Sequence, residues 1–195
     1  MKYNISFIGL GKLGLPLATN FARFGKKVLA IDLNESLLET LNSKKAPCIE
    51  PGLQENIEAA DANITYTNSY SEVADADNTI ILVNTPSIER DGSFSNEYVT
   101  SALTSTCNEI VKLGKESHNF ILSSTVMPGS IYSEFIPLIE SITGWTLGNQ
   151  FNFSYVPDFV AIGSVIKDFR DPDFVLIGSN EPEIAQDTFT LYACM

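Results

Sequence analysis

Short apolar runs alternate with longer amphipathic segments along almost the whole chain. Several runs are continuously hydrophobic, which is typical of parallel strands covered on both faces. They predict strands at Tyr3–Ile8, Lys27–Ile31, Ile64–Thr67, Thr79–Val83, Asn119–Ser123, Phe153–Val156 and Phe174–Ile177. The segments between them predict helices near residues 13–24, 35–43, 96–113, 130–142 and 181–192. This alternation predicts an α/β fold with a doubly wound, mostly parallel sheet.

Two segments depart from the alternation. Residues 87–95, which include Asp91-Gly92, are polar and rich in turn formers, so we expect a loop just past a strand. The last helical segment continues through apolar residues without a Gly or Pro stop signal. We therefore expect a single domain over residues 1–195, with residues 180–195 starting a helix that connects to a longer polypeptide.

Composition narrows the classes of partner. The chain is 44% hydrophobic and 18% charged, as in a globular protein, and its formal charge of −12 argues against nucleic acid or an anionic membrane. No apolar run is long enough to span a bilayer, and the N-terminal segment reads as a strand rather than a signal peptide. Cys48, Cys107 and Cys194 form neither a metal-binding spacing nor a disulfide framework, which favours a reducing, cytoplasmic location.

The strongest motif is Gly9-Leu10-Gly11-Lys12-Leu13-Gly14, which directly follows the first predicted strand and opens a helix. In that context, Gly9 permits a tight turn, Gly11 lets the backbone approach a pyrophosphate, and Gly14 lets the helix pack close to the strand. The helix N-terminus would present free N–H groups to the phosphates. The motif predicts dinucleotide binding, although FAD and S-adenosylmethionine sites share parts of it.

Asp32 ends the second predicted strand, 18 positions after Gly14. A carboxylate there would hydrogen-bond an adenosine ribose and repel a 2′-phosphate, which favours NAD over NADP. The alternative is that Asp32 only starts a turn or caps the following helix.

Two further groups of polar residues lie at predicted strand ends, where an open α/β sheet gathers its ligand contacts. Asn84, Thr85 and Pro86 would end one strand beside the cofactor, with Pro86 holding Thr85 extended. Ser124 and Thr125 end another, with hydroxyls that can donate to a nicotinamide ribose, a water or a substrate. Ordinary strand-end turn chemistry is the alternative for both groups.

An ordered set of motifs resembles the UDP-glucose/GDP-mannose (nucleotide-sugar) dehydrogenase family, whose N-terminal part is a Rossmann-type NAD-binding domain. The first is the glycine loop with Pro16 shortly after it. The others follow in the family's order: Glu50-Pro51-Gly52-Leu53, Val83-Asn84-Thr85-Pro86, Ser124-Thr125-Val126 with Pro128-Gly129, Pro157-Asp158-Phe159, Gly163-Ser164 with Asp168, and Asp171 to Gly178. The resemblance covers essentially the whole chain.

The resemblance implies oxidation of a primary alcohol of a nucleotide sugar to a carboxylate by two NAD⁺, in the service of polysaccharide biosynthesis. Thr125 would orient a water and Asp158, in place of the family's glutamate, would help to activate it. Ile162 replaces a second family glutamate, and Val156 an asparagine.

The family's nucleophilic cysteine lies in a Phe-Gly-Gly-X-Cys segment that this chain lacks. We therefore expect the chain alone to be inactive and its three cysteines, like His118, to be structural. The nucleotide sugar would bind mostly through an absent domain, and the full-length form would be a homodimer. Two alternatives remain: a β-hydroxyacid-type NAD dehydrogenase, or a truncated, non-catalytic NAD-binding module.

Overall fold

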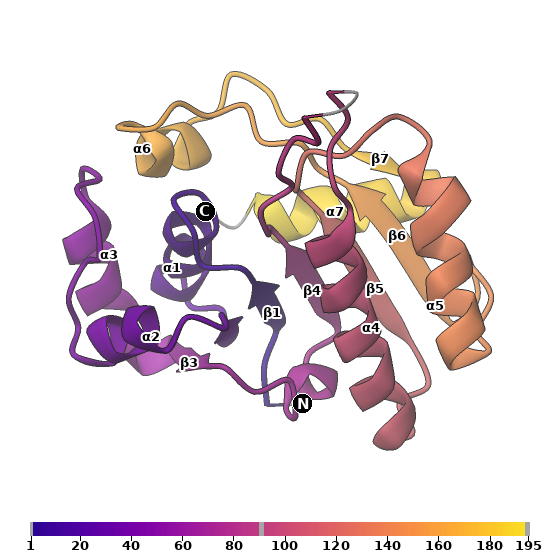
Figure 1. The fold of residues 1–195 in the computed structure, drawn as a ribbon. Helices are drawn as coiled ribbons and strands as arrows, with labels where there is room; N and C mark the ends of the chain where they lie inside the picture. The colour runs from indigo at the N-terminus through magenta and orange to yellow at the C-terminus, as the bar shows by residue number, and fades with distance from the viewer. Residues whose placement is uncertain (1, 90–91, 194–195) are drawn as a thin grey trace.

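The computed structural model describes residues 2–89 and 92–193, so Asp91 and Cys194 lie outside the described residues. Seven strands form one sheet in the order β3-β2-β1-β4-β5-β6-β7, which confirms the doubly wound α/β fold (Figure 1). The first six are parallel, and β7 pairs antiparallel with β6. Their bounds are β1 Ile5–Ile8, β2 Val28–Ile31, β3 Ile64–Thr67, β4 Asn78–Ile81, β5 His118–Leu122, β6 Phe151–Tyr155 and β7 Gly178–Ser179.

Helices cover both faces of this sheet. They are α1 Gly14–Arg23, α2 Glu35–Asn42, α3 Leu53–Ala60, α4 Glu97–Lys112, α5 Ile136–Thr143, α6 Val165–Arg170 and α7 Pro182–Tyr192. Short 3-10 turns at Asp61–Asn63 and Val73–Asp75 and a π-helical turn at Ile131–Phe135 complete the described elements. None of the helices that the structure describes is long and apolar enough to cross a membrane.

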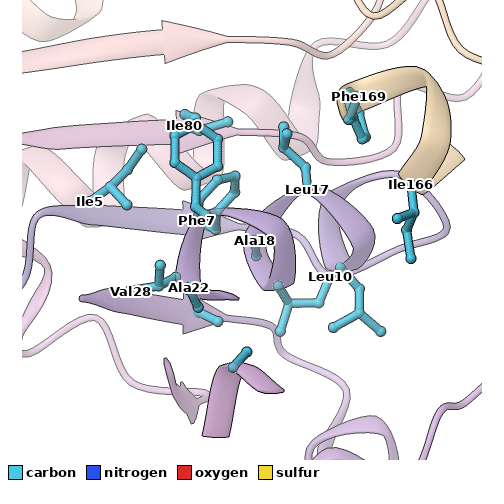
Figure 2. Close-up of a cluster of buried hydrophobic side chains, with 14 of the residues drawn as sticks. Ile5, Phe7, Leu10, Leu17, Ala18, Ala22, Val28, Ile80, Ile166 and Phe169 are labelled. Atoms are coloured by element: carbon cyan, nitrogen blue, oxygen red, sulfur yellow. The ribbon is translucent and has the colours of Figure 1, made fainter. Parts of the chain in front are cut away.

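Two hydrophobic clusters, one on each face, hold the layers together. Alternating strand positions divide between them, so that Ile5 and Phe7 of β1 face one cluster while Ile8 faces the other. The first cluster gathers α1, α3, α6 and the end of α7, and Figure 2 shows Ile166 and Phe169 of α6 lying beside α1. The second gathers α4 and α5. Because both faces are covered, the central strands are fully buried, which explains their continuous hydrophobicity.

The prediction of a strand at Phe174–Ile177 was wrong. That segment is a loop, and only Gly178 and Ser179 after it pair with β6. Val175 and Ile177 pack against the first cluster, whereas Phe174 and Leu176 are exposed. The alternating pattern that suggested a strand therefore reflects one-sided packing of an extended loop.

The sequence reading also missed α3 and α6. In α3 the buried positions Leu53, Asn56, Ile57 and Ala60 follow helical spacing, but a buried asparagine interrupts the apolar pattern. Helix α6 has six residues, which is too short for its periodicity to be recognised.

A ladder of asparagine amides crosses the strands of the second half of the sheet. Asn119 Nδ2 donates to Asn78 Oδ1 at 3.2 Å, Asn152 Nδ2 to Asn119 Oδ1 at 3.1 Å, and Asn180 Nδ2 to Asn152 Oδ1 at 3.2 Å. The side chains of Asn78, Asn119 and Asn152 occupy paired positions on β4, β5 and β6. A slip of one residue would break these bonds, so the ladder fixes the register of the strands.

A second polar chain is buried within the sheet. Ser6 Oγ and Thr79 Oγ1 are 2.7 Å apart, and Thr79 Oγ1 is 2.7 Å from His118 Nε2. Burial of the imidazole, together with the positive charge of Lys115, lowers the pKa of His118 from 6.5 to about 3. The histidine is therefore neutral in the folded protein at neutral pH, in the structural role expected of it.

This burial predicts acid-dependent stability. An unfolded His118 protonates below its ordinary pKa of 6.5, whereas the folded one resists protonation down to about 3. The neutral, buried His118 therefore makes its full contribution to the free energy of unfolding above pH 6.5. This contribution is lost as the pH falls towards 3. Between pH 7 and pH 5 the contribution lost by His118 is roughly 2 kcal/mol. Urea unfolding at pH 7 and pH 5 measures how much free energy of unfolding each protein loses on acidification. The loss should be smaller by this amount in His118→Gln than in the wild type, and equal losses in the two proteins would contradict the prediction.

Candidate functional site

A cleft of about 400 Å³ opens at the carboxyl ends of the strands, where the strand order reverses beside β1. The connections that leave β1 and β4 run to opposite faces of the sheet, and the space between them is where open α/β sheets bind ligands. The cleft is lined mainly by Gly9, Gly11, Asp32, Asn34, Tyr70, Val83, Asn84 and Tyr98.

The three glycines of the loop after β1 differ in what surrounds them. Gly9 has φ of +95°, and a side chain there would collide with the Leu82 carbonyl. A side chain on Gly14 would collide with the Gly9 carbonyl, so this glycine sets how closely α1 approaches β1. A Cβ on Gly11 would meet nothing within 4 Å, and Gly11 lines the cleft. The open space at Gly11 is thus available to a ligand rather than filled by the fold.

The N-terminus of α1 suits an anionic group. The helix has no side-chain cap and no acidic residue in its first turn. No side chain offsets the partial positive charge of this terminus. Leu15 N donates to Gly11 O, Leu17 N donates to Leu13 O and Pro16 has no N–H, so the attraction for phosphate oxygens comes mainly from the helix charge. These features fit a dinucleotide pyrophosphate, and they act locally against the unfavourable field of a chain with a net charge of −12.

Asp32 joins the ends of the first two strands. Its Oδ2 accepts a hydrogen bond from Leu10 N at 2.8 Å, and its Oδ1 accepts one from Asn34 N at 2.9 Å. The N-cap of α2 is Asn34, whose side chain accepts from Leu37 N, so Asp32 is not the helix cap. Carboxylate oxygens have further lone pairs, and Asp32 lines the cleft, where it can also accept from a ribose hydroxyl.

The side chains of the middle residues of the glycine loop do not line the cleft. The Leu10 side chain is buried in the first cluster, as Figure 2 shows, and Leu13 packs against the same cluster. The Lys12 side chain is exposed. Of the glycine loop, Gly9 and Gly11 line the cleft, together with Asp32 at the end of β2.

The two strand-end groups are placed differently from one another. Asn84 lines the cleft, while Thr85 and Pro86 follow it outside the lining. Ser124 is buried, and its hydroxyl accepts from Val83 N at 2.9 Å and donates to Val83 O at 2.8 Å. Its single proton is thus committed to the backbone, which corrects the expectation that it donates to a ligand: Ser124 holds the end of β4 against the end of β5.

Thr125 lines neither the cleft nor the cavity that contains Asp158. Thr125 is exposed beside the end of β5 and does not line the cleft. Asp158 follows β6 and lines a second cavity of about 210 Å³, where burial raises the pKa of its carboxyl from 3.8 to about 7. A carboxyl with such a pKa can both take up and release a proton near neutral pH.

Two acidic residues that the sequence assigned no role hold the loop between Asp158 and α6. Glu50 Oε2 accepts from Gly163 N at 2.8 Å. Asp168 Oδ2 accepts from Ala161 N at 3.0 Å and from Ser164 Oγ at 2.7 Å. Ile162, within this loop, is 69% exposed. The loop is therefore anchored at several points while its apolar tip faces solvent.

Sequence reasoning did not single out Tyr70 and Tyr98, which also line the cleft. Tyr98 could have been noticed in the sequence as an aromatic residue at the start of a predicted helix. Its side chain is half exposed in the first turn of α4. Among the described cysteines Cys48 is exposed and Cys107 is buried, and burial raises the pKa of the Cys107 thiol to about 12. No group of three potential metal ligands occurs within residues 2–89 and 92–193.

The glycine loop beneath a helix N-terminus, the acid at the end of β2 and the cleft at the reversal of strand order define a Rossmann-type dinucleotide-binding domain. A model of the UDP-glucose/GDP-mannose dehydrogenase family, NAD binding domain, matches residues 3–195. The chain belongs to this family, of which it is the NAD-binding domain.

Individual proteins that this chain resembles carry names of the same family. UDP-glucose 6-dehydrogenase AglM of Haloferax volcanii is 31% identical over 97% of this chain and 44% of its own length. GDP-mannose 6-dehydrogenase of Pseudomonas aeruginosa is 30% identical over 89% of this chain and 40% of its own length. The chain thus spans less than half the length of these relatives.

Solved structures give the same picture. A ternary complex of GDP-mannose dehydrogenase from Pseudomonas aeruginosa superposes with a TM-score of 0.92 at 27% identity, over 99% of this chain and 44% of that one. UDP-glucose dehydrogenase from Pyrobaculum islandicum superposes with a TM-score of 0.86 at 30% identity, over 98% and 44%.

The different surroundings of Gly11 and Gly14 give a first prediction for the site. Gly11→Ala should leave the melting temperature nearly unchanged but weaken NAD⁺ binding by about tenfold or more, because the new methyl group enters the space a pyrophosphate needs. Gly14→Ala should instead lower the melting temperature by several degrees, because its methyl group displaces α1 from β1. Calorimetric titration and thermal melts distinguish the two, and equal behaviour of the variants would refute the assignment.

Asp32 gives a second prediction. Asp32→Asn keeps an oxygen for Leu10 N but removes the charge, so NAD⁺ binding should weaken by about tenfold and the preference over NADP⁺ should narrow. The exposed Glu116→Gln, with the same change in net charge, serves as the control. Titrations of all three proteins with both cofactors test this, and an unaltered NAD⁺/NADP⁺ ratio in Asp32→Asn would count against the ribose contact.

Proposed function

We propose that this chain is the cofactor-binding part of a nucleotide-sugar 6-dehydrogenase, which oxidises the primary alcohol of a UDP- or GDP-linked sugar to a carboxylate with two NAD⁺. The observation that carries the proposal is the family match over residues 3–195, made by a chain whose cleft has the geometry of a dinucleotide site. The relatives named above act on UDP-glucose and GDP-mannose by their names. NAD⁺, when bound, accepts the hydride.

We assign the cofactor-binding roles from the lining of the cleft, and the roles of Thr125 and Asp158 from the family resemblance. Gly9, Gly11 and the start of α1 hold the pyrophosphate, Asp32 holds the adenosine ribose, and Asn84 with Thr85 and Pro86 borders the cofactor at the end of β4. Thr125 orients a water, and the Asp158 carboxyl takes up and releases the proton. Substrate contacts and the nucleophilic thiol come from the part of the enzyme outside this chain, and we place the assembled homodimer in the cytoplasm.

Support for an acid–base role at Asp158 comes from its raised pKa. Burial keeps its carboxyl half protonated near pH 7, where an ordinary aspartate would be fully ionised. Proton transfer is most efficient when the pKa of the catalytic group lies near the working pH. The pKa of Asp158 thus suits proton transfer, although its carboxyl reaches one methylene less far than a glutamate carboxyl.

A second candidate function is a non-catalytic NAD-binding module. The observation that favours it is Ile162, an exposed apolar side chain that can neither transfer a proton nor accept a hydrogen bond. Under this alternative the cofactor cleft is retained, while the loop after β6 lacks the second glutamate of the family, which Ile162 replaces.

Two measurements separate these functions. Calorimetry on this chain should show NAD⁺ binding, and NADH formation from UDP-glucose, GDP-mannose or UDP-N-acetyl sugars should require the full-length protein. In that protein Asp158→Asn should lower kcat by about a hundredfold or more with NAD⁺ affinity unchanged. Binding of NAD⁺ without oxidation of any of these sugars by the full-length protein would support the module instead. Absence of NAD⁺ binding would defeat both.

A further inference from the structure

Two arginines from distant parts of the chain meet at one asparagine side chain. Arg23, the last residue of α1, donates from Nη1 to Asn56 Oδ1 at 2.9 Å. Arg170, the last residue of α6, donates from Nη2 to the same oxygen at 2.6 Å. Because both nitrogens lie on one oxygen, they are at most about 5.5 Å apart. The two positive charges come this close because α6 packs beside α1 (Figure 2).

Neither guanidinium group has a carboxylate partner among the residues that the structure describes. The ion pairs within residues 2–89 and 92–193 are made by Lys2, Lys44, Lys112 and Lys115. Arg170 lines a cavity with Asp158 and Asp168, yet it forms an ion pair with neither within the described chain. Asp168 accepts from Ala161 N and Ser164 Oγ instead. The arginines therefore share a neutral amide oxygen in a chain that has 24 acidic residues.

The hydrogen bonds around Asn56 leave donors over. Asn56 and Asn20 are fully buried, and Asn56 Nδ2 donates to Asn20 Oδ1 at 2.6 Å. Asn20 Nδ2 and Arg170 Nε are buried and have no hydrogen-bond partner in the part of the chain that the structure describes. Native proteins leave few buried donors unpaired, and here both unpaired groups are donors. The cluster thus combines two positive charges with a shortage of acceptors.

Ordinary helix-end packing explains part of this arrangement. A helix C-terminus carries a partial negative charge that favours an arginine, and the Arg170 Cζ atom lies 5.7 Å from the centre of the Phe24 ring. These contacts stabilise each arginine singly and leave the two guanidinium groups to repel one another. The pKa of Arg170 is lowered first by burial and then by the positive charge of Arg23. The first 31 residues add to the local field, because they contain five basic side chains and no acidic one.

We propose that Arg23 and Arg170 form a phosphate site, in which one dianionic phosphate group bridges the two guanidinium groups. Arg23 is exposed and Arg170 is partly exposed, so their remaining N–H groups can reach a ligand from solvent. Guanidinium groups bind phosphate oxygens through paired N–H donors, and the two negative charges of the ligand match the two arginines. Arg23, Asn56 and Arg170 do not line the cofactor cleft. The site is therefore separate from the cleft and does not rest on the proposed function.

The test observes the arginine side chains directly. The chain has three arginines, so the Nε–Hε signals of nitrogen-15-labelled protein can be assigned with Arg23→Gln and Arg170→Gln. Inorganic phosphate, added at constant ionic strength against chloride, should shift the Arg23 and Arg170 signals with one common, saturable midpoint. Glycerol 3-phosphate should do the same, because it carries the same dianionic group. Acetate, a monoanion, should bind at least about tenfold more weakly.

Matched variants separate this site from a general effect of charge. Arg23→Gln should weaken phosphate binding by about tenfold or more, followed on the Arg170 signal. Lys45→Gln removes the same charge from an exposed position and should leave the midpoint unchanged. Asn56→Asp places a carboxylate between the guanidinium groups, and the unpaired Asn20 Nδ2 can turn to donate to it. This variant should melt at a higher temperature and lose the response to phosphate.

Arginine signals that do not respond to phosphate would overturn the proposal, as would equal midpoints in Arg23→Gln and Lys45→Gln. Acetate that binds as tightly as phosphate would refute the choice of a dianionic group. Displacement of phosphate from the arginine signals by saturating NAD⁺ would place the anion in the cofactor cleft and refute a separate site. If a variant at Asn56 or Arg170 fails to fold, the exposed Arg23→Gln decides alone. Arginine shifts in a chain that binds no NAD⁺ would refute the proposed function and leave this site standing.

Discussion

The close approach of α1 to β1 is the constraint on which the rest of the structure depends. It exists because Gly14 can lie against the Gly9 carbonyl, where any side chain would collide. This contact lets Leu17 and Ala18 of α1 pack in the same hydrophobic cluster as Ile5 and Phe7 of β1. The loop between β1 and α1 contributes Gly9 and Gly11 to the cleft. The Leu10–Asp32 hydrogen bond then ties the same loop to the end of β2. A cofactor site and half of the hydrophobic core thus share one steric requirement.

Asp32 and Asp158 lie in opposite environments. Asp32 lies at an open cleft, where its two carboxylate oxygens accept hydrogen bonds from the backbone N–H groups of Leu10 and Asn34. Asp158 lies behind apolar rings, where the neutral form is favoured. One residue type is therefore placed in two different environments, and the difference comes from the surroundings at the ends of β2 and β6.

Most of the sheet was predictable because buried parallel strands leave an uninterrupted apolar signature, and the glycine loop was predictable because its spacing has a steric cause. The misread segment Phe174–Ile177 shows the limit: alternation records which side chains are buried, not whether the backbone finds a strand to pair with. The position of Asp32 at the end of β2 could be predicted from its separation from Gly14 along the sequence. The commitment of the Ser124 hydroxyl to Val83, and the position of Thr125 outside the cavity that contains Asp158, depend on how strand ends meet in space. No local pattern carries that information.

The asparagine ladder has a consequence for how the domain behaves in isolation. The outer side of β6 would be an exposed sheet edge if it were not covered by the two residues of β7 and by Asn180, whose Oδ1 accepts from Phe153 N at 3.1 Å. Unprotected edges recruit strands from other molecules and lead to aggregation. The last rung of the ladder therefore helps to cover an edge that could otherwise pair with strands of other molecules.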